Sequence, residues 1–119
     1  MTFAYPRAAV LAVCSLVPAF VLVAACGAAC AGDVNAGRAK AMMCQACHGM
    51  DGLSLVPDAP NLAAQTEPYL VTQLRAYKSG IRKNDAMTVV SSSLSDKDVE
   101  DLAAYYSTIE IKIVKVPGE

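Results

Sequence analysis

Three residues in the middle of the chain have the types and the spacing to hold a cofactor. They are Cys44, Cys47 and His48, in the stretch Cys-Gln-Ala-Cys-His. Residues three and four apart project from one face of a helix. Two thiols on that face can each add to a vinyl group of a haem, with the imidazole under the iron as an axial ligand. The pattern is typical of covalent attachment of a c-type haem.

A structural zinc site and a thiol redox pair are the alternative interpretations of this motif. Zinc takes four ligands, usually as two spaced pairs, but the other cysteines, at positions 14, 26 and 30, lie in an apolar N-terminal segment. A thioredoxin-like pair belongs beside a β-α-β pattern, which the sequence does not show. We therefore predict one covalent haem c. Because His48 is the only histidine, the second axial position must go to another residue type or stay open.

The first 31 residues have the pattern of an export signal. No charged residue occurs between Arg7 and Asp33, and segment 8–31 is dominated by small and apolar side chains. This pattern predicts a secretory signal peptide cleaved after Ala31, so that residues 1–31 are the signal and residues 32–119 form one small periplasmic domain. A domain of this size buries little core of its own, and a haem would supply the apolar centre that it lacks.

Two other fates of the N-terminal segment stay open. Val23-Ala24-Ala25-Cys26 resembles a bacterial lipoprotein signal, which would leave a lipidated Cys26 as the N-terminus. An uncleaved segment of this length can also span a membrane, which takes roughly 20 apolar residues, although Pro18 and the many alanines argue against an anchor. Only in these two cases would the protein be attached to a membrane.

The charge balance gives no sign of a nucleic-acid-binding protein. The chain has ten Lys and Arg against eleven Asp and Glu, a net charge of −1, and removal of Arg7 with the signal makes it −2. Domains that bind nucleic acid are typically basic.

Three helices are predicted, and the motif lies at the end of the first. Asp33 or Asn35 can cap a helix that runs into the motif. Gly37 shares one face of this helix with Cys44. A glycine inside a helix costs about 1 kcal/mol relative to alanine, and it usually allows another backbone to come close. We therefore predict a helix crossing at Gly37.

The second and third helices have clear start signals. Segment 66–80 begins at Thr66 with a proline in the first turn and ends at a glycine. Segment 95–109 begins with Ser95, and Asp98 completes an approximate capping box. Segments 49–65 and 81–93 are predicted to be loops, and the alternation after Ile109 predicts an extended tail or a short strand.

The order of these parts resembles the class I cytochrome c family, above all small bacterial members with one haem and one half of members that duplicate this domain. It implies an all-α fold of three main helices and loops wrapped around one covalent haem. It also implies that Gly37 crosses Leu102 and Tyr105. The stretches that carry the resemblance are the haem motif, Pro60-Asn61-Leu62, Tyr69-Leu70, Gln73-Leu74, Tyr77-Lys78-Ser79-Gly80, Asn84-Asp85-Ala86-Met87, Leu94-Ser95-Asp96 and Asp101-Leu102-Ala103-Ala104-Tyr105-Tyr106.

The resemblance assigns roles to single residues. Met87 matches the distal axial ligand of the iron. Pro60 matches the proline whose carbonyl accepts the Nδ1–H of the ligating histidine, here His48, and so orients it. Leu62 matches a residue packed on the haem edge.

The distribution of methionines also favours Met87. Met42 and Met43 lie in the helix that carries the cysteines, and Met50 is two residues past His48. Only Met87 is far away, on a segment that can wrap over the ring. The alternative is that Met87 is core packing, as most methionines are.

The predicted function is electron transfer. With Cys44 and Cys47 bonded and with His48 and Met87 as axial ligands, no iron position remains for a substrate, and the iron cycles between ferrous and ferric states. The expected partners are redox proteins: a dehydrogenase, a cytochrome complex or an oxidase. A haem enzyme or gas sensor needs an open iron and polar distal groups, for which the sequence offers no second histidine. A permanent subunit of a dehydrogenase would have the same chemistry as a free carrier.

A basic group precedes the segment of Met87. It can guide an acidic partner or be an ordinary solvated helix end, and both interpretations stay open. The group consists of Arg75, Lys78, Arg82 and Lys83.

Overall fold

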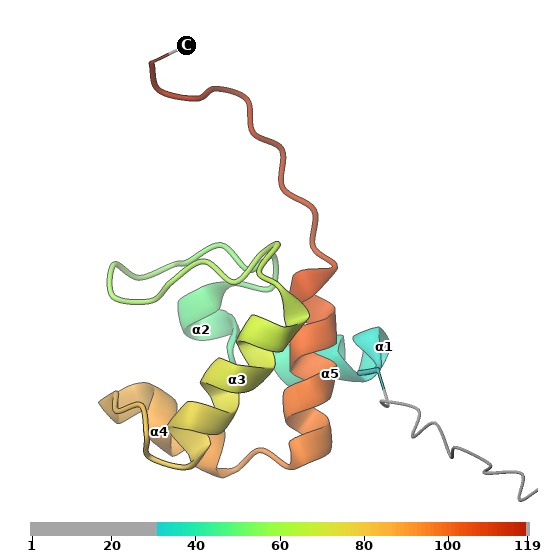
Figure 1. Ribbon diagram of the computed structural model, residues 1–119, viewed down its shortest axis with the longest axis vertical. Helices are drawn as coiled ribbons and strands as arrows, with labels where there is room; N and C mark the ends of the chain where they lie inside the picture. Colours follow the sequence, from blue (N-terminus) through green and yellow to red (C-terminus); the bar gives the residue numbers. More distant parts are fainter. Residues whose placement is uncertain (1–30, 119) are drawn as a thin grey trace, which may run out of the picture.

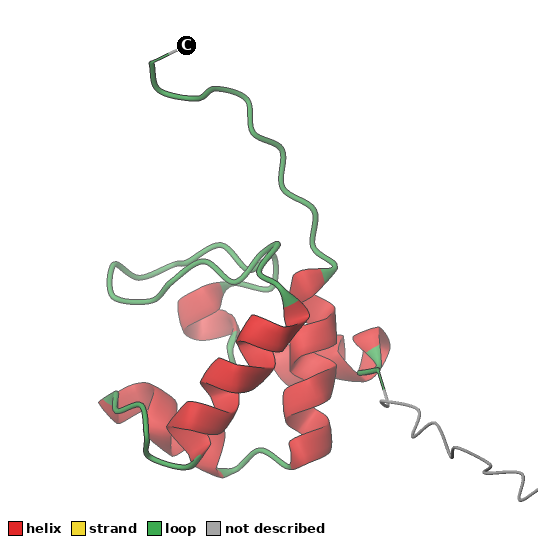
Figure 2. Cartoon of the chain, viewed as in Figure 1, coloured by secondary structure: helices red, strands yellow, loops and turns green. Residues whose placement is uncertain are grey.

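The computed structural model describes residues 31–118. It contains five helices, α1 (Val34–Ala41), α2 (Gln45–His48), α3 (Glu67–Lys78), α4 (Asp85–Ser92) and α5 (Asp96–Ser107). No strand occurs between residues 31 and 118, as Figure 2 shows, so the all-α prediction is confirmed. Residues 1–30 lie outside the described part of the chain, and with them lie the predicted signal and its alternatives. Within residues 31–118, no helix is long and apolar enough to cross a membrane.

The first helix starts where predicted but does not run through the motif. Asp33 is the N-cap, and its carboxylate accepts the N–H groups of Asn35 and Ala36 at 2.8 and 3.0 Å. The helix ends at Ala41, and a turn over residues 42–44 separates it from α2. In this turn the N–H of Cys44 bonds to the carbonyl three residues back, at 2.9 Å, which tightens the backbone. The prediction of one continuous helix is therefore wrong at this point.

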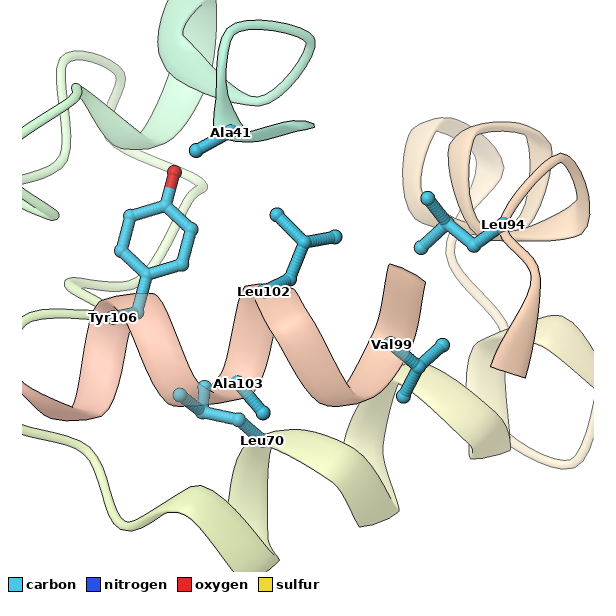
Figure 3. Close-up of a cluster of buried hydrophobic side chains, with 7 residues drawn as sticks. All are labelled: Ala41, Leu70, Leu94, Val99, Leu102, Ala103 and Tyr106. Carbon is cyan, nitrogen blue, oxygen red and sulfur yellow. The ribbon is translucent and has the colours of Figure 1, made fainter. Parts of the chain in front are cut away.

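Helices α3 and α5 confirm their predicted start signals. Thr66 is the N-cap of α3. Just past the other end of this helix, Gly80 has a φ of +76°, the left-handed conformation that ends a helix. At the start of α5, Ser95 and Asp98 form a complete capping box. The two helices lie beside each other in Figure 1. Figure 3 shows the core that they share with Ala41 at the end of α1 and with Leu94 just before α5. Its residues are Ala41, Leu70, Leu94, Val99, Leu102, Ala103 and Tyr106.

The prediction that segment 81–93 is a loop is wrong, because residues 85–92 form α4. The β-branched run and the serines after it have modest helix propensity. The Asn84 side chain overcomes this by accepting the N–H of Met87 at 2.9 Å, as a helix cap does. The helix also packs against α3 and buries Ser91, whose hydroxyl donates to the carbonyl of Met87 at 2.6 Å.

The crossing predicted at Gly37 is present between α1 and α5. A Cβ atom at Gly37 would lie 1.9 Å from the carbonyl oxygen of Asp101 and 2.8 Å from the Cβ of Tyr105. The nearest neighbour is thus the backbone of Asp101 rather than Leu102. Gly32 makes a second close approach that the sequence analysis missed, since its Cβ would lie 2.1 Å from the carbonyl oxygen of Glu100.

Carboxylates of α5 hold α1 in this position. Asp101, which is buried, accepts the backbone N–H of Asp33 at 2.6 Å and forms an ion pair with Lys97. Lys97 and then the N–H of Asp33 lower the pKa of Asp101. Asp98 pairs with Lys40 of α1 at 2.8 Å, and Lys40 followed by Ser95 lowers the pKa of Asp98 to about 2.

The chain leaves the helical domain after α5. Residues 109–118 have no regular structure, and Figure 1 shows them extending away from the helices. Their large apolar side chains, Ile111, Ile113, Val114 and Val116, are exposed. The extended tail is confirmed, and its alternative, a short strand, is wrong.

Replacing Gly37 by alanine should destabilise the protein. Helix propensity alone would favour alanine by about 1 kcal/mol, but the new methyl group would force α1 away from the Asp101 carbonyl, and overpacking costs about 1–3 kcal/mol. The midpoint of guanidinium unfolding measures the balance. Arg38→Ala, at the exposed next position, is the control and should change stability by no more than about 0.5 kcal/mol. An unchanged or raised midpoint for Gly37→Ala would show that the helices separate easily.

The ion pair between Asp98 and Lys40 should make stability depend on pH. The folded protein holds the pKa of Asp98 at about 2, below the ordinary value of about 3.9, so this contribution is complete above pH 4 and is lost as the pH falls towards 2. Asp98→Asn should therefore be less stable than wild type at pH 7 and approach it below pH 3. Unfolding curves at several pH values test this. Asp58→Asn, at an exposed loop position, should follow the wild type throughout, and a pH-independent gap for Asp98→Asn would contradict the prediction.

Candidate functional site

One cavity brings together every residue that the sequence analysis predicted for the haem. It lies among α2, α3, α4 and α5 and the loop before α3, and most of its wall is apolar. Residues between Met43 and Tyr106 contribute to the wall, although they are far apart in the sequence. The six predicted residues on this wall are Cys44, Cys47, His48, Pro60, Leu62 and Met87.

The buried His48 has its ring fixed by one hydrogen bond. Its Nδ1 lies 2.9 Å from the carbonyl oxygen of Pro60. A carbonyl can only accept, so Nδ1 carries the proton and donates it, which leaves the lone pair of Nε2 for a metal. This is the tautomer that an axial ligand needs, and such a hydrogen bond also fixes the orientation of the ring.

The loop that supplies the Pro60 carbonyl is itself tied down. Asn61 accepts the N–H of Ser54 through its side chain at 2.7 Å. The N–H of Leu62 bonds to the carbonyl of Gly52 at 2.7 Å. Gly52 has a φ of +71°, and a Cβ there would lie 2.6 Å from the nitrogen of Ala63, so only glycine allows this close approach. The position of the histidine's partner therefore depends on a closed loop.

Two tyrosines of α5 hold the backbone directly after His48. The hydroxyl of Tyr105 donates to the carbonyl of Met50 at 2.7 Å, and the hydroxyl of Tyr106 donates to that of Gly49 at 3.3 Å. Burial, followed by the neighbouring Cys44, raises the pKa of Tyr106, so its hydroxyl stays protonated and remains a donor. The sequence analysis missed these bonds, because spacing identifies a tyrosine on a core face but not the partner of its hydroxyl.

The two motif cysteines differ in their surroundings. Cys44 is half-buried and Cys47 is exposed. Burial raises the pKa of the Cys44 thiol to about 11, and Cys47 adds to the shift. Within residues 31–118, no three His, Cys, Asp or Glu side chains come together to hold a metal ion. Two thiols and one imidazole on an apolar wall fit a porphyrin better than a zinc ion, which takes four ligands.

Met87 lies in the first turn of α4 and on the cavity wall, rather than in a loop. Met43 also lines the cavity, whereas Met42 is 63% exposed. The carbonyl of Met50 is held by Tyr105, and its side chain packs against the core. Two methionines thus remain as candidates for an iron ligand. Met43 is on the segment of the cysteines and Met87 is on a separate helix.

A polar part of the wall was not anticipated from the sequence. It consists of Gln65, Tyr69, Gln73, Tyr77 and Arg82. The first four are spaced four residues apart, a signal that was available in the sequence but was masked by the apolar Leu70 and Leu74 beside them.

An all-α domain with a C-x-x-C-H motif on the wall of an apolar cavity has the architecture of a c-type cytochrome. The chain belongs to the cytochrome c family, whose model matches residues 34–110. Membership implies a covalently bound haem c. The predicted family, the class I all-α fold and a haem-based electron-transfer function are confirmed by this match and by the relatives described next.

The relatives are bacterial cytochromes. Over 83 residues the chain is 47% identical to cytochrome c-554(548) of Halomonas halodenitrificans, a match covering 67% of this chain and 100% of that protein. It is 46% identical to cytochrome c4 of Pseudomonas aeruginosa over 70% of this chain and 41% of that protein. The solved structure of reduced recombinant cytochrome c4 from Pseudomonas stutzeri matches with a TM-score of 0.63 and 45% identity, over 67% of this chain and 47% of that chain. The chain thus spans about half or less of the length of the cytochrome c4 proteins that it matches.

Removing either cysteine should reduce covalent haem incorporation. In Cys44→Ala and Cys47→Ala one thioether bond is lost, and the double variant has no thiol left in the motif. Little folded protein should remain, because a domain this small has too little apolar burial without its haem. Haem staining of denaturing gels measures attachment, with Met42→Ala at an exposed neighbouring position as the control. Full staining of the double variant would disprove attachment through these cysteines.

Proposed function

We propose that this chain is a periplasmic electron carrier with one covalent haem c and with His48 and Met87 as axial ligands. The haem supplies reversible one-electron chemistry at its iron. Cys44 and Cys47 hold the ring, and the Pro60 carbonyl keeps the His48 imidazole in the ligating tautomer. The observation that carries the proposal is that His48 and Met87, from different helices, line the same cavity as both cysteines.

The chain's own residues also tune the iron. A thioether ligand such as Met87 favours the ferrous state, so the reduction potential should lie above that of a site with two histidines. The apolar wall, which includes Leu70, Leu74 and Leu102, excludes water and favours the less charged state. With both axial positions filled, no iron position is left for a substrate, which supports a carrier rather than an enzyme.

The partners are other redox proteins, which we assign by class as a dehydrogenase, a cytochrome complex or an oxidase. The basic group considered above gives little support for docking to an acidic partner. Arg75 pairs with Glu100 at 3.2 Å and Lys78 pairs with Asp96 at 2.9 Å, so two of its four charges are compensated within the chain. The solvated interpretation of this group is therefore favoured.

Substituting Met87 tests the ligand assignment. Met87→Ala should open the iron without detaching the haem, since the motif is untouched. The variant should bind carbon monoxide, its potential should fall, and the ferric protein should lose the weak near-infrared band of a sulfur–iron bond. Optical spectra and a redox titration measure all three.

Met43→Ala is the matched control, because Met43 lines the same cavity on the segment of the cysteines. It should keep the near-infrared band and the wild-type potential. If Met43→Ala loses the band and Met87→Ala keeps it, the ligand assignment is wrong. If the wild type already binds carbon monoxide rapidly, the iron is open and the protein is a sensor or an enzyme.

A further inference from the structure

The polar stripe on the cavity wall has a regular origin. Tyr69, Gln73 and Tyr77 follow one another at four-residue intervals in α3, so they project from one face of the helix. Gln65 precedes them at the same interval, just before the helix begins. The stripe brings amide and phenol groups to a cavity whose other walls are mainly aliphatic.

Arg82 completes this stripe and brings a permanent positive charge to the cavity wall. Its guanidinium donates to the side-chain oxygen of Gln73 and lies over the ring of Tyr77, 4.7 Å from the ring centroid. Its backbone N–H bonds to the carbonyl of Ala76 at 3.0 Å. Two residues of the stripe therefore hold a cation at the cavity, although Arg82 itself is exposed to solvent.

A haem brings two carboxylates as well as the two vinyl groups that the motif cysteines use. The carboxylates need a counter-charge or hydrogen-bond donors where they meet protein. Arginine presents a planar fork of donors that matches a carboxylate. The other members of the basic group are less suitable, because Arg75 and Lys78 are paired with acidic residues of α5 and Lys83 does not line the cavity.

We propose that Arg82, positioned by Gln73 and Tyr77, binds a carboxylate of the haem and thereby raises the reduction potential of the iron. This inference rests on the proposed haem but not on which methionine ligates it. An unpaired carboxylate beside the ring stabilises the ferric state by its negative charge, and the guanidinium cancels that charge. The pairing also fixes the edge of the haem that is not held by thioether bonds.

The test compares two charge-removing variants of the haem-loaded protein, Arg82→Gln and Lys83→Gln. Lys83 is the adjacent exposed residue and does not line the cavity, so both variants lose one charge at nearly the same place. In Arg82→Gln the resonance Raman band of haem propionate bending should shift and the potential should fall. Lys83→Gln should leave the band in place and change the potential less.

Arg82→Lys separates the hydrogen bonds from the charge and is available if the glutamine variant does not fold. It keeps the charge but lacks the planar fork, so the Raman band should shift while the potential falls less than in Arg82→Gln. Equal spectra and potentials for the Arg82 and Lys83 variants, or an unshifted band in Arg82→Lys, would overturn the proposal. The near-infrared band should persist in all three variants. Its absence from the wild type would refute the methionine ligand without affecting the inference on Arg82.

Discussion

The close approach of α1 and α5 at Gly37 is the constraint on which the site depends. The chain leaves α1 directly into the turn that carries Cys44, so the placement of α1 sets where the motif begins. The same α5 that α1 crosses sends the hydroxyls of Tyr105 and Tyr106 to the residues just after His48. One helix thus fixes the motif at both ends. The missing side chain of Gly37 lets α1 lie close enough for this, and the Asp101 carboxylate holds it there by accepting the N–H of Asp33.

The hydrophobic core and the cavity share residues, which links stability to the cofactor. Leu70, Leu102 and Tyr106 belong to the buried cluster and also line the cavity. A chain of this length buries a smaller share of its surface than a large domain does. A haem packed on these three side chains would extend the core instead of filling a separate pocket. The fold and the site therefore have the same physical basis, since both depend on apolar contacts made by α3 and α5.

Local signals were sufficient for much of this structure, and long-range contacts were not. The caps of α3 and α5 and the attachment motif involve residues within a few positions of each other, so the sequence identifies them directly. The break after Ala41 and the helix α4 depend on local hydrogen bonds and packing that outweigh propensity, and both were predicted wrongly. The hydroxyl partners of Tyr105 and Tyr106 lie more than fifty residues away, and spacing carries no information on such pairs. The sequence identifies Arg82 as a positive charge in the basic group, but only the fold shows that it lines the cavity.

The two sides of the cavity are held unequally. The ring of His48 bonds to the Pro60 carbonyl, and Tyr105 and Tyr106 hold the backbone directly after it, all through contacts between residues at least 12 positions apart. Met87 lies at the start of a short helix, where the bonds of its own backbone are to Asn84 and Ser91, close by in the chain. Elements with few long-range bonds open at a lower free-energy cost than elements tied into the core. The wall at Met87 can therefore change with less disturbance of the fold than the wall at His48, and this makes Met87 the more informative of the two positions to substitute.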